Sequence, residues 1–243
     1  MNLAIDIGNT RTKLGVFEEQ RLVQVAVWEQ WTIVKLNNFL TNHSVQNVIY
    51  STVGQLSTEK EHYLKEECRA LELTAATPLP FINTYHTPET LGKDRLAAVA
   101  GALELHKDNN CLVIDAGTCI TYDVLTAAGE YVGGNISPGL TMRLRAMHHF
   151  TARLPLVERQ QPAEKIGKST VTAMQIGAGW GTILEMQGAI DHFKEKFGTI
   201  TIVLTGGDTD FFVNSLKSEI FVHQNLVLIG LNKILNYNVQ FLE

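Results

Sequence analysis

The sequence predicts an α/β fold built from two similar lobes, and three observations support this prediction. Along the whole chain, segments in which apolar residues recur at every second position, as in strands, alternate with segments in which they recur every three or four positions, as in helices. The 243 residues are enough for one large domain or two small ones. An Asp-x-Gly motif after a buried strand, at Asp6 and Gly8, occurs again 109 residues later at Asp115 and Gly117. We therefore expect an internal duplication, with lobes at residues 1–108 and 109–243 and a cleft between them.

The first lobe begins with three predicted strands. They span Leu3–Ile5, Thr12–Phe17 and Leu22–Val27, and short loops join them, which favours an antiparallel meander. Helical spacing follows over Ile33–Leu40, and Asn47–Thr52 is strand-like.

The rest of this lobe is divided by capping and breaking residues. Ser57, with acidic residues in the following turn, predicts the start of a charged helix. A loop with three prolines is expected over Thr77–Pro88, and an alanine-rich helix over Asp94–His106.

The second lobe is predicted to repeat the strand meander and to carry long helices. Glycines at positions 177, 179 and 181 fall within one helical pattern, where we expect them to permit close helix packing. The predicted strands are Cys111–Ile114, Ile120–Leu125, Tyr131–Ile136 and Ile200–Leu204, and the helical patterns run over Thr170–Lys196 and Leu226–Leu235.

Composition excludes several classes of protein. Hydrophobic residues make up 45% of the chain and charged residues 19%, which is typical of a globular protein. The formal net charge of −5 argues against a broad electrostatic hold on nucleic acid or a membrane surface. No signal-peptide core precedes Asp6, and the three cysteines form no CxxC pair, so we expect reduced thiols in a cytoplasmic protein.

The turn after the first strand has the composition of a phosphate-binding loop. Gly8 allows backbone N–H groups to approach an anion, Thr10 and Thr12 add hydroxyl donors, and Lys13 adds a positive charge. Asp6 is suited to holding Mg²⁺ through water. The alternative is an ordinary turn whose polar side chains satisfy nearby backbone groups.

Two further strand ends carry candidate phosphate or nucleotide contacts. The stretch from Asp115 to Asp123, which includes Thr118, could face the same phosphates from the second lobe. The glycines of Thr205-Gly206-Gly207-Asp208 would let a ribose or a flat ring approach the backbone. The alternative for this last motif is a tight turn in which Asp208 caps a helix.

The segment Gly92-Lys93-Asp94-Arg95 joins the proline-bearing loop to a helix. Simple capping of that helix by Asp94 is one interpretation. The functional interpretation makes Asp94 the base that accepts a proton from an attacking hydroxyl. Arg95 would then bind a substrate carboxylate or stabilise the phosphoryl charge.

Three other signals are rejected. Gly167-Lys168-Ser169 resembles the end of a P-loop, but Pro162 stands where the first glycine is needed. The glycine cluster within the helical pattern at 177–181 follows no strand, so it is not a dinucleotide fingerprint. The histidines show no zinc-binding spacing, and His148 and His149 would point apart on a helix.

Taken in order, these motifs resemble those of the type III pantothenate kinases, which belong to the acetate-kinase, sugar-kinase and actin superfamily. The resemblance covers nearly the whole chain. Its motifs are DxGNTRxK (Asp6 to Lys13), a Tyr85-x-x-Pro88 loop leading to GxDR (Gly92 to Arg95), DxGTxxTxD (Asp115 to Asp123), GGxIxPG (Gly133 to Gly139), TxRLP (Thr151 to Pro155), GxST (Gly167 to Thr170) and TGGD (Thr205 to Asp208).

This resemblance implies two ribonuclease H-like, actin-like lobes, each a mixed sheet flanked by helices. It also implies transfer of the ATP γ-phosphoryl group to the primary hydroxyl of pantothenate, the first step of coenzyme A synthesis, with Asp94 as proton acceptor. The residues implied to contact ATP are Asp6, Ile7, Gly8, Asn9, Thr10, Arg11, Thr12, Lys13 and Thr118.

The resemblance further implies the substrate and ion sites. Tyr85, Gly92, Lys93, Asp94 and Arg95 would line the pantothenate site, and Thr170 would reach it from the partner subunit of a homodimer. Asp115 would bind a monovalent cation, K⁺ or NH₄⁺, beside the Mg²⁺ held through water at Asp6. We expect no nucleic-acid or membrane partner.

Two alternative functions are open at this point. A non-catalytic regulator could use the same scaffold, because fold does not determine function. Another activity of the superfamily, such as a polyphosphate phosphatase or a different small-alcohol kinase, would retain the phosphate loops and change the acceptor site.

Overall fold

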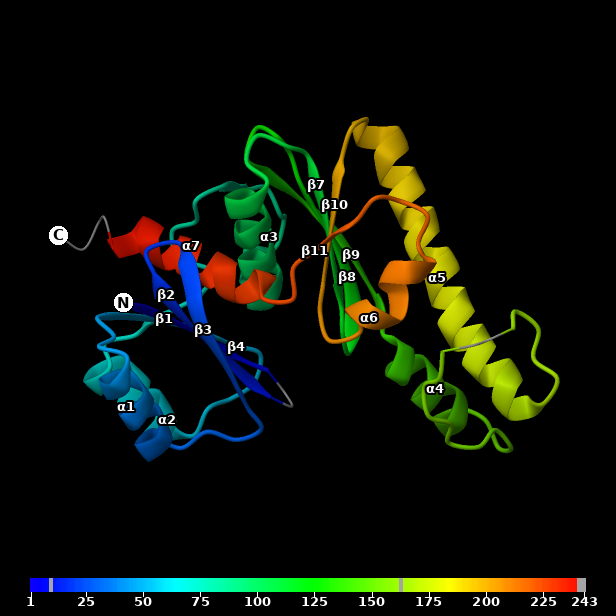
Figure 1. The fold of residues 1–243 in the computed structure, drawn as a ribbon, viewed down its shortest axis with the longest axis horizontal. Coiled ribbons are helices and arrows are strands. Elements are labelled where there is room, and N and C mark those ends of the chain that lie inside the picture. The colour runs from blue at the N-terminus through cyan, green and yellow to red at the C-terminus, as the bar shows by residue number, and fades with distance from the viewer. Residues whose placement is uncertain (9–10, 162–163, 240–243) are drawn as a thin grey trace. The chain divides into compact units, whose positions relative to one another are not determined.

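The computed structural model describes residues 1–8, 11–161 and 164–239, which form two compact units (Figure 1). The first unit comprises Met1–Asp108, Leu125–Val132 and the described residues from Asn225 onward. The second comprises Asn109–Val124 and Gly133–Gln224. The predicted lobe boundary at residues 108 and 109 falls where the first unit passes to the second, and the chain then returns twice to the first unit.

The first unit is built on a five-stranded sheet in the order β3-β2-β1-β4-β5. Strand β1 pairs antiparallel with β2 and parallel with β4, β2 pairs antiparallel with β3, and β4 pairs parallel with β5. The predicted meander and the strand after it are confirmed. The strands are β1 (Asn2–Ile7), β2 (Thr12–Glu18), β3 (Arg21–Trp28), β4 (Asn47–Thr52) and β5 (Leu71–Glu72).

Helices cover both faces of this sheet (Figure 1). On one face lie α1 (Ile33–Asn42), α2 (Thr58–His62) and a π-helical turn at Tyr63–Glu67. Thr32 and Ser57 cap α1 and α2 through their hydroxyl groups. On the other face, α3 (Lys93–Leu105) and α7 (Leu226–Val239) pack against each other.

The second unit contains most of a six-stranded sheet in the order β11-β10-β7-β8-β9-β6. Its first five strands repeat the order of the first sheet, because β9-β8-β7-β10-β11 corresponds to β3-β2-β1-β4-β5. Strand β10 pairs parallel with both β7 and β11, as β4 pairs parallel with β1 and β5. The strands are β7 (Cys111–Ala116), β8 (Cys119–Leu125), β9 (Glu130–Pro138), β10 (Thr201–Thr205) and β11 (Phe221–Val222).

The sixth strand, β6 (Ile82–Asn83), lies inside the predicted proline-bearing loop. It pairs parallel with the start of β9, where Asn83 lies opposite Tyr131. A short 3-10 helix at Pro88–Thr90 then leads to α3. The middle of this loop is therefore held against a sheet edge, which its prolines did not indicate.

Three α-helices and a 3-10 turn accompany the strands in the described part of the second unit. The predicted helical patterns over Thr170–Lys196 form one helix, α5 (Thr170–Phe197), and the helix α4 (Leu140–His149) has no counterpart in the sequence predictions. Four of the ten residues of α4 are Arg or His, and Gly139 at its N-cap has no side chain that could signal the start of a helix. The remaining elements are α6 (Thr209–Phe212) and a 3-10 turn at Val213–Ser215.

The start of α5 explains the motif that resembled the end of a P-loop. Ser169 is the N-cap, and it forms a reciprocal capping box with Thr172. A Cβ atom on Gly167 would lie 2.4 Å from the Cα atom of Ala173, so only glycine allows the preceding loop to turn so closely over the helix. These residues therefore begin a helix.

We expected Gly177, Gly179 and Gly181 of α5 to permit close helix packing, and for Gly177 and Gly181 no such packing is found among the described residues. Gly179 is buried. A Cβ atom at Gly177, Gly181 or Gly188 would meet no other atom of the described structure within 4 Å. Close packing through glycine occurs instead between α3 and α7. There a Cβ on Gly101 would lie 2.4 Å from the carbonyl oxygen of Leu226, and one on Gly230 would lie 1.7 Å from that of Ala97.

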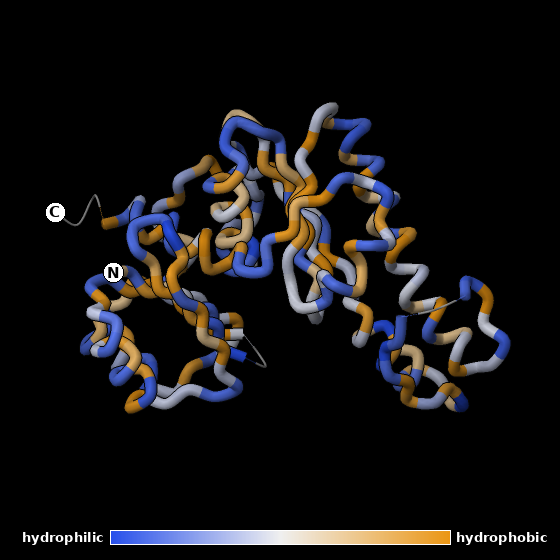
Figure 2. Tube along the Cα trace, in the orientation of Figure 1, coloured by the Kyte–Doolittle hydropathy of each residue, from blue (hydrophilic) through white to orange (hydrophobic). Residues whose placement is uncertain are grey.

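Apolar residues fill the interior of each unit (Figure 2). The first core packs Leu3, Ile5 and Leu14 of the sheet against Leu36 of α1. The second packs the β7, β8 and β10 side chains against α5 residues such as Ile183 and Met186. Within the part of the chain that the structure describes, no helix is both long and apolar enough to cross a membrane.

The α3–α7 contact generates a stability prediction. Gly230→Ala should lower the free energy of unfolding by more than about 2 kcal/mol, because the added methyl group overlaps backbone that cannot move independently. Urea denaturation measures the change. Gly54→Ala is the matched control, since open space surrounds Gly54, and its effect should stay within about 0.5 kcal/mol. Equal stability of the two variants would contradict the packing argument.

Candidate functional site

The predicted phosphate loop of the first unit follows directly from the pairing of β1 with β2. Asp6 lies opposite Lys13 in this antiparallel pair, and the Gly8 N–H donates to the carbonyl oxygen of Arg11 at 3.0 Å. Thr12 is buried and Arg11 is exposed. Asn9 and Thr10 of the predicted loop lie outside the described residues. The remaining residues form a tight strand–turn–strand connection with Asp6 and Lys13 at its base.

Asp6 is the electrostatic centre of this region. Its neighbour in the parallel pair with β4 is Ser51, whose Oγ donates to Asp6 Oδ1 at 3.1 Å. Burial raises the pKa of Asp6, and the charge of Asp94 raises it further, while Ser51 and Lys13 act in the opposite direction. The influence of Asp94 means that the structure brings these two predicted site carboxyls near each other.

Asp94 lies in the first turn of α3, and its conformation depends on a glycine. Gly92 is the N-cap of α3 and has no side chain to cap it. The Asp94 Oδ1 atom accepts a hydrogen bond from the Arg95 N–H at 2.9 Å. A Cβ on Gly92 would lie 2.5 Å from that same oxygen, so the absence of a side chain makes room for the carboxylate. Asp94 is therefore not the N-cap of α3, although its carboxylate satisfies one free N–H of the first turn.

The predicted substrate residues Tyr85 and Arg95 lie together. The Arg95 guanidinium carbon is 5.6 Å from the centre of the Tyr85 ring, and only 4% of Arg95 is exposed. Tyr85 stacks in turn on Tyr131, with ring centres 6.1 Å apart. Tyr131 is fully buried, and its carbonyl oxygen accepts hydrogen bonds from the N–H and hydroxyl of Thr84. This aromatic column holds the loop that bears Tyr85.

We did not identify Tyr131 as a functional candidate, because the sequence pattern predicted only that it lies in a strand. The pairing of β6 with β9, which brings Tyr131 to the loop, joins residues far apart in the sequence. No local signal marks such a pairing.

Lys93 lies beside a polar pocket. Its Nζ atom is 3.6 Å from Glu72 Oε1, and Glu72 also pairs with Lys65 at 3.1 Å. With Tyr50 and neighbouring residues of the β4 end, Lys93 and Glu72 line a pocket of about 330 Å³. Burial raises the pKa of Tyr50, and the Glu72 carboxylate adds to this effect.

Three loops of the second unit meet at the carboxyl end of β7, which carries Asp115. A Cβ on Gly139 would lie 2.1 Å from the carbonyl oxygen of Gly117, and one on Gly206 would lie 2.5 Å from Asp115 Oδ1. Gly206 also has φ +99°, a conformation that favours glycine. Thr118, predicted to contact phosphate, is exposed at this point. The GGxIxPG and TGGD motifs thus pack against the predicted phosphate loop.

Asp208 of the TGGD motif does not cap α6 through its side chain. Its carboxylate instead pairs with Arg159, and its N–H donates to the carbonyl oxygen of Ala116 at 2.9 Å. The motif is therefore fixed to the end of β7 by backbone and to the segment after α4 by an ion pair.

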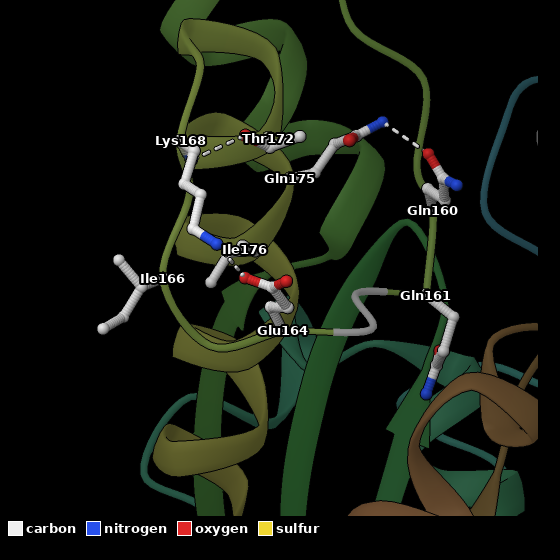
Figure 3. Close-up of a pocket in the computed structure, with 8 residues that line it drawn as sticks. All are labelled: Gln160, Gln161, Glu164, Ile166, Lys168, Thr172, Gln175 and Ile176. Atoms are coloured by element: carbon white, nitrogen blue, oxygen red, sulfur yellow. Dashed lines mark hydrogen bonds and ion pairs between the residues drawn. The ribbon is translucent and has the colours of Figure 1, made fainter.

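Thr170 is the first residue of α5 and is exposed. Near it, α5 and described residues that precede it line a pocket of about 310 Å³ (Figure 3). Lys168 and Glu164 form an ion pair at 3.3 Å, and Gln175 donates to Gln160 at 3.3 Å across the opposite side (Figure 3).

A polar network anchors α5 to the second sheet and to α4. Glu185 Oε1 accepts from the Tyr122 hydroxyl at 3.0 Å, and Glu185 Oε2 accepts from Arg143 Nη2 at 2.5 Å. Arg143 also donates to the carbonyl oxygen of Pro138 at 2.8 Å, next to the glycine that packs on the phosphate loop. Burial alone would raise the pKa of Glu185, but hydrogen bonds from Ser137, Arg143 and Tyr122 outweigh it and lower the pKa.

The donor groups present suit hard cations. Mg²⁺ at phosphoryl-transfer sites is typically held by one or two carboxylates together with water and substrate phosphate. Asp6 has one oxygen bound by Ser51, and its second oxygen has the chemistry for this role. Asp115 offers carboxylate oxygen beside the Gly206 turn. Across residues 1–8, 11–161 and 164–239, no group of three or more His, Cys, Asp and Glu side chains forms a metal cluster.

Comparison with known proteins identifies close relatives. A family model described as type III pantothenate kinase matches residues 2–192. The chain is 46% identical over 239 residues to a type III pantothenate kinase of Bacteroides fragilis, and the match covers 98% of each chain. It is 42% identical over 240 residues to a type III pantothenate kinase of Christiangramia forsetii, covering 98% of this chain and 99% of the relative.

Solved structures share the fold at lower identity. A Campylobacter jejuni protein described as a Baf family transcriptional activator has a TM-score of 0.63 at 23% identity, with 98% of this chain and 99% of that chain covered. The activator of 2-hydroxyisocaproyl-CoA dehydratase from Clostridium difficile, with bound ADPNP, has a TM-score of 0.55 at 10% identity, with coverages of 99% and 96%. These likenesses confirm the predicted actin-like α/β fold class.

The Glu185 network generates a prediction with a defined pH dependence. Glu185→Gln should lower the free energy of unfolding by about 1 kcal/mol at pH 7, since a half-exposed charged hydrogen bond is lost. Because the pKa of Glu185 is lowered on folding, its contribution is present at neutral pH and disappears as pH falls through that pKa. Denaturant unfolding should therefore give a smaller difference in unfolding free energy between the parent and Glu185→Gln below about pH 4 than at pH 7.

The control for this prediction is Glu195→Gln, on the same helix but exposed. It should change the unfolding free energy by less than about 0.5 kcal/mol at either pH. A Glu185→Gln effect that persists undiminished in acid would contradict the proposed charge dependence.

Proposed function

This chain belongs to the type III pantothenate kinase family, and we propose that Asp94 accepts the proton when the γ-phosphoryl group of ATP moves to the primary hydroxyl of pantothenate. The product is 4′-phosphopantothenate, formed in the first step of coenzyme A biosynthesis. The observation that carries this proposal is the placement of Asp94 at the start of α3, near enough to Asp6 for its charge to raise the Asp6 pKa.

The phosphate loops would bind and orient ATP. Lys13, which lies opposite Asp6, would provide positive charge in the first unit. Contacts of the turn after β1 and of Thr12 with the phosphates are those that the family resemblance implies. Thr118 provides a hydroxyl in the second unit. Asp6 would hold Mg²⁺ through water, and the ion would neutralise charge on the phosphates. The roles of Ile7, Arg11, Asn9 and Thr10 remain those that the family resemblance implies.

In the transfer, the pantothenate hydroxyl oxygen forms a bond to the γ-phosphorus, and the bond from that phosphorus to the bridging oxygen breaks. The hydroxyl proton goes to Asp94. In phosphoryl transfer, alignment and charge neutralisation provide most of the acceleration, so a carboxylate serves as an adequate late acceptor. The Gly92 turn supports this role because it leaves room for the Asp94 carboxylate.

Pantothenate would bind beside Asp94. Arg95 is suited to its carboxylate, since guanidinium groups bind carboxylates through paired hydrogen bonds. The stacking of Tyr85 over Arg95 supports a shared role for these two residues. Gly92 and Lys93 complete the proposed site, and Thr170 reaches it from the partner subunit. Asp115 would bind the monovalent cation, K⁺ or NH₄⁺, and the enzyme would act in the cytoplasm.

The exposed face of α5 supports a homodimer. Gly177, Gly181, Leu184 and Gly188 follow one another at intervals of four, three and four residues, so they share one face of the helix. Open space adjoins each of the three glycines, and 55% of Leu184 is exposed. Small residues on such a face allow two helices to approach closely. We assign this face to contact with α5 of a second copy.

The activity is tested by incubating the protein with Mg²⁺-ATP, K⁺ and pantothenate. We expect phosphopantothenate, and we expect Asp94→Asn to lower kcat by a factor on the order of 10² to 10⁴ while nucleotide binding is retained. Asp210→Asn, at an exposed position of α6, is the matched control and should have the parent rate. An Asp94→Asn variant with full activity would remove Asp94 from this role.

A panel of acceptors separates the alternatives. Pantothenate, other small alcohols and inorganic polyphosphate are offered to the same folded protein. Phosphorylation of pantothenate above all other acceptors is expected. Absence of any product from pantothenate would reject the kinase proposal and favour a regulator or another activity of the superfamily.

The dimer prediction is tested by sedimentation. Leu184→Asp should shift the mass from dimer to monomer, because two carboxylates would be buried at the proposed α5 contact. Val34→Asp, at a helical position that is 70% exposed in the first unit, is the control and should leave the mass unchanged. A dimer that survives Leu184→Asp, or a parent protein that is monomeric, would contradict this interface.

A further inference from the structure

The two predicted site carboxylates occupy equivalent positions in their sheets, and each has a hydroxyl residue directly beside it. In the parallel pairing of β1 with β4, Asp6 lies next to Ser51. In the parallel pairing of β7 with β10, Asp115 lies next to Thr205. Residues paired in register on neighbouring strands share a face of the sheet. The duplication therefore includes a fourth strand that brings a hydroxyl group to the loop carboxylate.

Both hydroxyl residues are buried. Ser51 is 1% exposed and Thr205 is 2% exposed. A buried hydroxyl needs a hydrogen-bond partner to offset its lost hydration. For Ser51 that partner is Asp6, since Oγ lies 3.1 Å from Oδ1. Ser51 belongs to none of the sequence motifs and lies 45 positions from Asp6. Thr205 is the first residue of the TGGD motif and lies outside the turn that bears Asp115.

The hydrogen bond restricts the orientation of the Asp6 carboxylate. Rotation about the last bond of an aspartate side chain has broad minima, so an unrestrained carboxylate samples many orientations. The Ser51 hydroxyl on β4 binds one carboxylate oxygen of Asp6, and the other carboxylate oxygen is thereby held in a defined direction. For a carboxylate that holds an ion through water, this orientation determines where the water and the ion lie.

We propose that Ser51 is a positioning residue that orients Asp6 for Mg²⁺-nucleotide binding, and that Thr205 occupies the equivalent place for Asp115. The proposal rests on the proposed function for the identity of the ion and nucleotide. It extends that function to two strand residues outside the phosphate turns. The role belongs to the hydroxyl group, so serine and threonine should be interchangeable at either position, and residues without a hydroxyl should not be.

The first test compares Ser51→Ala with Ser51→Thr. Calorimetry measures the affinity for a non-hydrolysable ATP analogue in the presence and absence of Mg²⁺. Ser51→Ala should weaken the Mg²⁺-dependent part of this affinity about 10-fold or more, as is usual when a residue that orients a metal-binding carboxylate is removed. Ser51→Thr should restore it. Analogue binding without Mg²⁺ should change little in either variant.

The matched control is Thr52→Val. Thr52 is the next residue of β4, and its hydroxyl donates to the carbonyl oxygen of Gly54 at 2.9 Å. Successive strand residues face opposite sides of the sheet, so this variant removes a neighbouring hydroxyl without affecting Asp6. It should bind the Mg²⁺-analogue like the parent protein. Thermal melts of all variants establish that each is folded.

Kinetics separate positioning from a general structural effect. Ser51→Ala should lower kcat and raise the Mg²⁺ concentration needed for half-maximal rate, while KM for pantothenate stays within about 2-fold of the parent, since the acceptor contacts other residues. A folded Ser51→Ala variant with parental Mg²⁺-analogue affinity would overturn the proposal. Loss of affinity in Ser51→Thr equal to that in Ser51→Ala would also overturn it, because the hydroxyl would then not be the cause.

Thr205 is tested in the same manner with the monovalent cation. Thr205→Val retains the shape of threonine without the hydroxyl, and it should raise the K⁺ concentration for half-maximal analogue binding by about 10-fold. Thr205→Ser should not. A K⁺ response in Thr205→Val identical to that of the parent would overturn the assignment of Thr205.

Failure of this inference is distinguishable from failure of the proposed function. The analogue-binding measurements contain no pantothenate and require no turnover. A protein that binds Mg²⁺-nucleotide through Ser51 and Asp6 but phosphorylates another acceptor would uphold the Ser51 assignment and reject pantothenate. If Ser51→Ala phosphorylates pantothenate at the full rate, the pantothenate kinase proposal would be upheld and the Ser51 assignment would be rejected.

Discussion

The register of the parallel pair β1–β4 is the constraint on which the first-unit site depends. It aligns Asp6 with Ser51, while the antiparallel pair β1–β2 aligns Asp6 with Lys13. A shift of one residue in either pairing would turn these side chains to opposite faces of the sheet. The register is held by the apolar residues that alternate with Asp6 on β1, Ile5 and Ile7, which pack into the core on the other face. Core packing and site geometry are thus set by the same strand.

Glycines provide the second constraint, because they allow backbone to approach backbone at the site. Gly139 and Gly206 bring two loops against the end of β7, and Gly92 leaves space for the Asp94 carboxylate. At Gly206 and Gly139 a methyl group would overlap carbonyl oxygens of the predicted phosphate loop. The glycine motifs therefore help to hold the loop that bears Asp115 and Thr118 in place by allowing close packing. They are far apart in the sequence because they follow different strands.

The fold class, the strand meander of each lobe and the helices α1, α3, α5 and α7 were predictable from the sequence because their signals are local: apolar periodicity, capping residues or, in α3, a run of alanines. The family was likewise predictable from its ordered motifs. The helix α4 was not, since four of its ten residues are Arg or His and Gly139 at its N-cap offers no capping side chain. The β6 strand was hidden by the prolines around it, and the position of Tyr131 beside Tyr85 depends on a pairing that no local pattern marks.

The sequence by itself determined which residue types stand at the strand ends, since an Asp-x-Gly motif after a buried strand is visible in the order of residues alone. Only the tertiary structure decided which side chains from other strands stand beside those carboxylates. Ser51 became a neighbour of Asp6, and Thr205 a neighbour of Asp115, through parallel pairings between strands separated by whole helices. The physical reason is that side-chain periodicity is encoded locally, whereas the register between distant strands results from packing the complete core.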